Sequence, residues 1–261
     1  MSAAYDTYDY LSYWLGRGYE HKAEALAIRE FLQKIKKVRT ILEVGAGFGR
    51  LIGSYAFRAK KVIVTDPSSK LLRIARDRFR DKKKFRFIHT SLENLPDKVR
   101  GGSIDLVIII RVMHHLKNLE ESVSILARIV KKGGYLILEY PNKRNWKAII
   151  KEVLQGNLTF PLDIFPKDLR SKRSVKLKKL PFFNYHPDKI QSLLVSNGFS
   201  VIEKRSVSNL RSGPLKRALS IDTLLFLEKY LQVPLAFLSF GPSIFILARK
   251  GDRIYKYLTI L

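Results

Sequence analysis

Short apolar runs alternate with amphipathic segments through the first half of the chain. Five runs are apolar on both faces, and they cover residues 40–45, 61–66, 85–90, 104–110 and 134–140. Between two of these runs, "SSKLLRIARDRFRD" repeats its apolar positions with the 3.6-residue period of a helix. Strands that are apolar on both faces and alternate with helices are typical of a parallel sheet buried between helical layers. The pattern therefore predicts an α/β fold with a doubly wound sheet.

A helical segment is expected ahead of the first strand. In "EHKAEALAIREFLQKI", Ala25, Ile28, Leu32 and Ile35 form one apolar stripe, and the charged residues lie opposite. An aromatic patch precedes this helix, and it comprises Tyr5, Tyr8, Tyr10, Tyr13, Trp14 and Tyr19.

The second half of the chain is less regular. We expect the strands "FSVIEKR" and "SIFILARK" to close the sheet, and two insertions at about 141–187 and 206–241 to form a substrate cap. From 143 to 189 the sequence has twelve Lys or Arg against four acids, which is too charged for a buried core. The second insertion contains the strongly apolar helix "SIDTLLFLEKYLQV". The insertions are predicted to lie on the functional rim of the sheet.

Composition fits a single folded domain over residues 1–261, because 46% of the residues are hydrophobic. The absence of cysteine excludes disulfides and thiolate metal sites. The first residues lack the pattern of a secretory signal, and no stretch is apolar enough to cross a bilayer, so we expect a cytoplasmic location.

Lys and Arg exceed the acids by 26, which favours contact with RNA or an acidic membrane, or else a Lys-rich solvated surface.

The segment "ILEVGAGFGR" (41–50) combines the first predicted strand with a glycine-rich turn. In a parallel sheet this first strand-to-helix turn is the usual nucleotide site, because glycine lets a ligand approach the main chain and the next helix presents free N–H groups. Gly45, Gly47 and Gly49 have the spacing G-x-G-x-G, and Arg50 stands where a dinucleotide site needs glycine. Asp66 follows about twenty residues later, where a carboxylate can bind ribose hydroxyls. These residues predict an adenosine site.

From Ile41 to Lys250 the chain resembles the class I S-adenosylmethionine-dependent methyltransferases. "ILEVGAGFGR" and "VIVTDPS" look like the first two motifs of that family, with Asp66 at the ribose position and Pro67 beside it. "FIHTSLENLP", "IDLVIIIRVMHHLKN" and "IVKKGGYLILEYPN" resemble the next three in family order. The resemblance implies a Rossmann-like sheet of seven strands, mostly parallel with an antiparallel last strand, and helices on both faces. It also implies the cofactor S-adenosyl-L-methionine, converted to S-adenosyl-L-homocysteine.

The same resemblance assigns residues to the cofactor. Glu43 and the carbonyl of Arg111 would face the methionine ammonium, and the backbone around Ala46 and Gly47 would lie beside the ligand. Glu43 has an alternative structural role as a carboxylate near the start of the following helix.

At the third motif the family has Gly-Asp where this chain has Thr90 and Ser91. Adenine would therefore be held by the Ser91 hydroxyl or by the backbone of Ser91 and Leu92. Residues 1–38 correspond to a lid over the cofactor, in which Tyr13 and Arg17 would contact it and Arg17 would pair with its carboxylate. Alternatively, these side chains cover the sheet edge.

Methyl transfer needs alignment of nucleophile, methyl carbon and sulfur, and it requires no metal. Where the acceptor must lose a proton, His114, His115 and Glu139 are the candidate bases; the histidines could instead orient their loop.

We expect the methyl acceptor to be a small or lipid-like molecule. An anionic acceptor would suit the cationic first insertion. Contact of the second insertion with a membrane surface is an alternative to its burial. An RNA methyltransferase and a non-catalytic cofactor-binding or scaffold protein are the competing functions.

Overall fold

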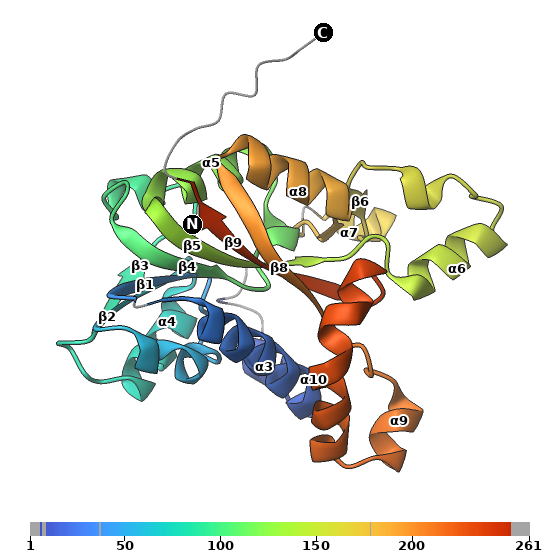
Figure 1. Ribbon diagram of the computed structural model, residues 1–261, viewed down its shortest axis with the longest axis horizontal. Coiled ribbons are helices and arrows are strands. Elements are labelled where there is room, and N and C mark those ends of the chain that lie inside the picture. Colours follow the sequence, from blue (N-terminus) through green and yellow to red (C-terminus); the bar gives the residue numbers. More distant parts are fainter. Residues whose placement is uncertain (1–5, 7–8, 37, 178, 252–261) are drawn as a thin grey trace, which may run out of the picture.

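The sheet has seven strands and is covered by helices on both faces (Figure 1). The computed structural model describes residues 6, 9–36, 38–177 and 179–251. The strands are β1 (Thr40–Val44), β2 (Lys61–Asp66), β3 (Phe85–His89), β4 (Ile104–Ile109), β5 (Val130–Pro141), β8 (Phe199–Val207) and β9 (Ser243–Lys250). Their order across the sheet is β3-β2-β1-β4-β5-β9-β8, and β9 is antiparallel to both of its neighbours. The predicted fold class is confirmed, including the antiparallel last strand.

Two apolar cores lie on opposite sides of the sheet. Helices α3 (Gly18–Lys34), α4 (Ser69–Arg78) and α10 (Ile221–Phe237) cover one face, and α5 (Leu119–Ile129) and α8 (Pro187–Ser196) cover the other (Figure 1). Ile108 in β4 packs in the first core, whereas its neighbour Ile109 packs in the second. Because successive side chains in a strand point to opposite faces, each central strand contributes to both cores. This two-sided burial explains the uninterrupted apolar runs.

The segment after the glycine turn differs from the prediction. Instead of an α-helix, the chain forms two short 3₁₀ helices, η1 (Ile52–Ser54) and η2 (Ala56–Arg58). Gly53 lies inside η1, and glycine disfavours a continuous helix because it has the most backbone freedom to lose. The glycine turn is therefore followed by 3₁₀ helices and not by the N-terminus of an α-helix.

The charged positions of α3 also depart from the sequence interpretation. The apolar stripe predicts Glu20 and Glu24 on the solvent side, but both are buried, with 2% of each residue exposed. Ahead of α3 lies the short helix α2 (Tyr10–Tyr13). Residues 1–5, 7, 8 and 37 of the predicted lid, with Tyr5 and Tyr8 of the aromatic patch, lie outside the described residues.

The two insertions lie in different places. The first, after β5, contains α6 (Trp146–Leu154), η5 (Phe160–Leu162), β6 (Lys167–Asp168), α7 (Lys172–Lys176) and β7 (Phe183–Asn184). The second contains α9 (Gly213–Ala218) and α10. Glu228 in α10 accepts a hydrogen bond from Tyr19 (2.6 Å), and Gln232 donates one to the Ala23 carbonyl (3.1 Å). Helix α10 therefore belongs to the layer beside α3.

Among the residues that the structure describes, no helix has the length and apolar character needed to span a bilayer.

Candidate functional site

A cavity opens at the carboxyl ends of β1, β2 and β4, where the chain passes from strand to loop. Its volume of about 270 Å³ is just below the ~300 to 1,000 Å³ range of small-molecule sites. Its walls come from the glycine turn, the ends of β2 and β4, the loop after β3, the N-terminal segment and the first insertion. The lining residues are Tyr10, Val44, Gly45, Gly47, Asp66, Pro67, Leu71, Thr90, Ser91, Leu92, Glu93, Arg111, Val112, His115, Leu116 and Leu180.

The glycine turn fits this place because side chains there would collide with the neighbouring loop. Gly45 has φ +70°, and a Cβ atom on it would overlap Val112 Cγ2. Gly49 has φ +77°, and its Cβ would lie 2.9 Å from Ile52 and 3.2 Å from Ala75 in α4. Positive φ is costly for residues with a Cβ atom. The absence of a side chain at Gly45 therefore allows the loop after β4 to approach closely, and its absence at Gly49 allows α4 to do so. Gly47 faces the cavity.

Asp66 ends β2 and links the glycine turn to the next loop. Its carboxylate accepts hydrogen bonds from the backbone N–H groups of Gly47 (2.7 Å) and Ser68 (2.8 Å). Burial raises the pKa of Asp66 to about 6, although these two hydrogen bonds oppose the shift. The Ser68 hydroxyl donates in turn to Asp6 (2.6 Å), which ties the N-terminal segment to this corner. Asp66 thus presents a buried carboxylate at the cavity wall.

Several residues predicted to contact the cofactor share this cavity. Gly45, Gly47 and Asp66 line one side, and Ser91 and Leu92 line the loop after β3. Pro67 and Arg111 also contribute to the wall. The structure thus brings together the predicted ribose and adenine residues, although they come from loops after three different strands.

Four other predicted residues are not part of the cavity wall. Glu43 is buried behind the turn, where its carboxylate accepts a hydrogen bond from Tyr55 Oη (2.5 Å). Burial raises the pKa of Glu43 to about 7. Ala46 and Gly49 lie in the turn without lining the cavity, and Glu139 in β5 is buried. The contact of Glu43 with the methionine ammonium remains a prediction.

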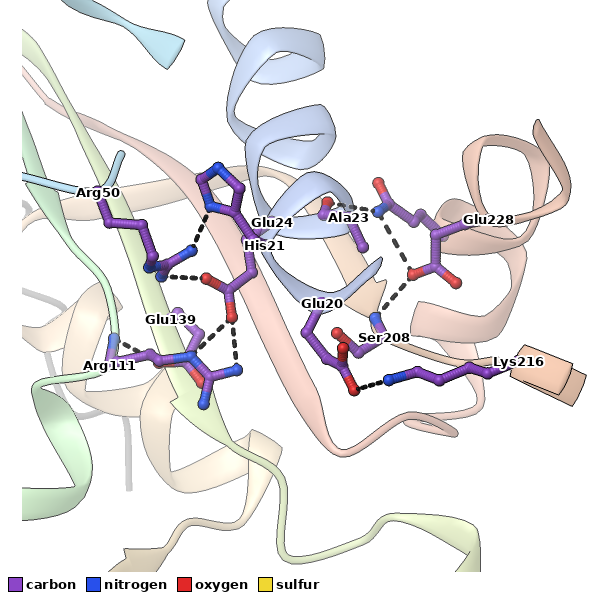
Figure 2. Close-up of polar contacts among 11 residues, drawn as sticks. Glu20, His21, Ala23, Glu24, Arg50, Arg111, Glu139, Ser208, Lys216 and Glu228 are labelled. Atoms are coloured by element: carbon purple, nitrogen blue, oxygen red, sulfur yellow. Dashed lines mark hydrogen bonds and ion pairs between the residues drawn. The ribbon is translucent and has the colours of Figure 1, made fainter. Parts of the chain in front are cut away.

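Two arginines beside the cavity share one buried carboxylate (Figure 2). Glu24 Oε1 accepts from Arg111 Nε (2.7 Å), and Glu24 Oε2 accepts from Arg50 Nη2 (2.5 Å). Burial opposes ionisation, but Arg111 and Arg50 hold the pKa of Glu24 below its ordinary value. The Trp14 ring lies against both guanidinium groups, with Arg50 Cζ 3.6 Å from its centroid. This Arg50–Glu24–Arg111 cluster fastens the N-terminal segment to the loops after β1 and β4.

The N-terminal segment reaches the cavity through Tyr10. A Cβ atom on Gly47 would lie 3.5 Å from the Tyr10 ring, so α2 covers the glycine turn. Tyr13 and Arg17 do not line the cavity; the Arg17 guanidinium lies 4.1 Å from the centroid of the Tyr13 ring. Their predicted cofactor contacts therefore remain predictions, and Tyr10 is the aromatic residue of α2 that the cavity contains.

Of the three candidate bases, only His115 lines the cavity. Its Nδ1 lies 2.7 Å from the Pro181 carbonyl oxygen, and a carbonyl can only accept, so Nδ1 carries a proton. Burial lowers the pKa of His115, which favours the neutral ring. In that tautomer the lone pair is on Nε2, as a general base requires.

The other two candidate bases, His114 and Glu139, are buried and contact other groups of the protein. The His114 ring is buried, with its centroid 3.9 Å from that of His115 and 4.6 Å from that of Phe182. Burial lowers the pKa of His114 well below its ordinary value. Glu139 accepts a hydrogen bond from the backbone N–H of Arg111 (2.8 Å), whose φ is +58°. Glu139 thus holds the main chain at the end of β4.

Sequence reasoning missed several residues of this site. Glu24 has the helical spacing of a solvent-facing charge, and Arg50 enters the sequence interpretation only as an obstacle to a second nucleotide. Leu180 lies in the basic insertion, 65 positions beyond His115 in the chain. No local pattern marks it, because only the folded insertion brings it to the cavity.

The seven-stranded sheet with its antiparallel last strand has the topology of the class I methyltransferase fold, and the cavity lies at the carboxyl ends of its strands. Residues 42–138 match the family model described as a methyltransferase domain. Over these residues the chain is similar to a methyltransferase domain, and the match covers less than half of the chain.

Relatives and a solved structure are similar to parts or most of this chain. Fusarielin synthase of Gibberella zeae is 28% identical over 136 residues, which are 49% of this chain and 5% of that protein. The ubiquinone biosynthesis O-methyltransferase of Aromatoleum aromaticum is 30% identical over 117 residues, which are 44% of this chain and 49% of the relative. The chain thus spans at most about half the length of these relatives.

A crystal structure of an S-adenosylmethionine-dependent methyltransferase from Mesorhizobium loti superposes with a TM-score of 0.59 at 16% identity, covering 89% of this chain and all of that chain. At this identity the likeness shows the shared fold.

Proposed function

We propose that this chain transfers the methyl group of S-adenosylmethionine to a small-molecule or lipid-like acceptor. The observation that carries the proposal is one cavity that contains the glycine turn, the buried Asp66 carboxylate and His115. The first two suit an adenosyl group, and the third suits an acceptor that loses a proton. The relative from Aromatoleum aromaticum, named for O-methylation in ubiquinone biosynthesis, supports an acceptor of this size class.

The residues present fit the cofactor. Asp66 offers a carboxylate to the ribose hydroxyls, and Ser91 and Leu92 lie where adenine would be held. Gly47 exposes main chain to the ligand because it has no side chain. The bound cofactor would supply an electrophilic methyl group on sulfur, and the chain has only to align it with the acceptor.

His115 is the base that we assign to the acceptor end of the cavity. Its Nδ1 proton is held by the Pro181 carbonyl, which leaves Nε2 as the basic atom of the neutral ring. An acceptor hydroxyl or acidic carbon would transfer its proton to Nε2 as the methyl group is transferred. For an acceptor that needs no deprotonation, His115 would act only in positioning.

The direct test is calorimetry of the full chain with S-adenosylmethionine and S-adenosylhomocysteine. Asp66→Asn should weaken both by about 100-fold, because an ionised acceptor is replaced in a buried site. Asp97→Asn is the matched control, since Asp97 is exposed in η3 (Leu95–Asp97). Absence of binding to the folded wild-type chain contradicts the proposal.

Incubation with the labelled methyl donor and a cell extract then identifies the class of acceptor. We expect the label in small molecules or lipids. Label confined to RNA would replace this acceptor class by the competing one, and donor binding without any labelled product would favour a non-catalytic role.

A further inference from the structure

The first insertion carries several large apolar side chains that are mostly exposed. Leu154, Leu158, Leu162 and Phe165 are 82%, 71%, 79% and 73% exposed, respectively. Single exposed apolar residues are ordinary, but a concentration of them marks a surface that contacts another phase or molecule. In Figure 1 the segment from α6 to α7 forms the edge of the molecule farthest from β2 and β3.

Helix α6 has the form of an interfacial helix. It contains no buried residue, and Trp146, Ile150 and Leu154 follow one another at four-residue spacing on one side. Trp146 stacks on Phe240, with ring centroids 5.5 Å apart, which anchors this side of the helix to the body of the protein. Lys147 and Lys151 are exposed in the same helix. An apolar side with Trp and flanking lysines is the pattern of helices that lie in a membrane surface.

The charges of the insertion complement an anionic surface. Each acid of the insertion forms an ion pair within it. The pairs are Glu152 with Lys167, Asp163 with Lys143, and Asp168 with Arg170. Seven other described cations form no ion pair with any residue that the structure describes: Arg144, Lys147, Lys151, Lys172, Arg173, Lys176 and Lys179. Unpaired cations beside exposed aliphatic side chains match anionic lipid headgroups above an acyl layer.

The same insertion forms a wall of the cavity. Leu180 lines it, and the Pro181 carbonyl holds His115. We propose that the insertion docks on an anionic membrane surface, so that an amphiphilic methyl acceptor enters the cavity beside Leu180. The acceptor part rests on the proposed function, whereas the docking part does not.

Lipid explains the surface better than RNA does. RNA would account for the cations, but leucine and phenylalanine side chains gain little from phosphate groups. Burial of those side chains in the interfacial layer accounts for both kinds of residue. RNA binding is accordingly an outcome that the test must separate.

The test is co-sedimentation of the full chain with vesicles of phosphatidylcholine, with and without phosphatidylglycerol. We expect binding to the anionic vesicles only, weakened by salt. Combined Leu154→Ser, Leu158→Ser and Leu162→Ser should lower the partition coefficient about tenfold or more. The control is Phe226→Ser with Tyr230→Ser, two side chains of α10 that are 62% and 63% exposed, and it should bind like wild type.

A second pair of variants tests the charges. Lys172→Gln with Lys176→Gln should lower binding about tenfold, because each cation near an anionic surface contributes to partition. Lys82→Gln with Lys83→Gln changes net charge equally in the turn before β3, at the other edge of the sheet, and should have little effect.

Three outcomes would overturn the inference: equal binding to neutral vesicles, equal binding of the serine variant, or salt-sensitive binding to RNA without vesicle binding. Calorimetry with the methyl donor on the same variants keeps the two proposals apart. For the wild-type chain, absence of donor binding would contradict the proposed function, whereas donor binding without binding to anionic vesicles would contradict the docking surface. The serine variant is expected to lose vesicle binding and to keep donor binding.

Discussion

The two segments that enclose the cavity, the N-terminal segment and the first insertion, are held in opposite ways. The N-terminal segment is fastened by buried contacts: Glu24 pairs with Arg50 and Arg111, and Tyr19 donates to Glu228. The first insertion is held near its two ends by Lys143, by the Tyr185 hydroxyl, which donates to the Met113 carbonyl (3.1 Å), and by the contact of Pro181 with His115. Most of its other side chains are exposed or half-exposed. The N-terminal wall of the cavity is therefore part of the core, whereas most of the first insertion is exposed. If the proposals hold, the first wall covers the cofactor and the second meets an external partner.

The largest expected effect comes from cutting the N-terminal fastening. Glu24→Gln removes the buried charge that compensates two largely buried arginines, whose side chains are 10% and 18% exposed. Breaking such a cluster should lower the free energy of unfolding by about 3–5 kcal/mol. Asp163→Asn is the corresponding change in the insertion. It should cost less than about 1 kcal/mol, because Asp163 is half-exposed and Lys143 Nζ keeps the carbonyls of Asp163 and Phe165. Denaturant unfolding measures the free energy of unfolding of both variants. Equal losses of stability would contradict the difference between the N-terminal segment and the first insertion.

Gly45 tests whether the cofactor side is fixed by the main chain. Gly45→Ala combines positive φ with a steric overlap on Val112, and should destabilise the fold by about 2–4 kcal/mol. Gly53→Ala is the control, since a Cβ atom added there would meet no atom within 4 Å and its φ is not positive. It should be neutral or slightly stabilising in the same unfolding experiment. A neutral Gly45→Ala would show that the turn can relax.

His115 sharpens the comparison at the acceptor side. His115→Asn should lower kcat about 100-fold for an acceptor that must be deprotonated, with the affinity for S-adenosylhomocysteine unchanged. The acceptor fraction found by labelling serves as substrate. In wild type, kcat should fall at low pH as the ring becomes protonated, and the variant should lose this limb.

His114→Asn is the control for that experiment. It alters the neighbouring ring without removing the base, so the low-pH limb should persist even if the protein is less stable. Persistence of the limb in His115→Asn would exclude His115 as the base.

The smallest effect is the pH dependence of cofactor binding. The ribose hydroxyls need an ionised Asp66, and burial raises the pKa of Asp66 to about 6. Affinity for S-adenosylhomocysteine should therefore be constant above that pH and fall about tenfold as the pH drops from neutral to about one unit below the pKa. Calorimetry across this range measures it. In Asp66→Asn the dependence should disappear; an unchanged slope would assign the titration to another group.

Most of the sheet could be predicted from the sequence because parallel strands buried on both faces must be apolar throughout. The runs at 40–45, 61–66 and 104–110 correspond to β1, β2 and β4 within a residue at each end. The glycine turn and Asp66 were also predictable, since both lie directly after strands whose carboxyl ends meet at one edge.

Side-chain partners far apart in the chain were decided only by the tertiary structure. Glu24 appears solvent-facing on its own helix, yet it is buried because Arg50 and Arg111 come from the loops after β1 and β4. Helices α6 and α10 are both rich in apolar residues, but α10 packs beside α3 whereas α6 contains no buried residue. The sequence period of a helix shows that the helix has an apolar side. Only the packing of the helices and the sheet determines whether that side contacts protein or remains exposed.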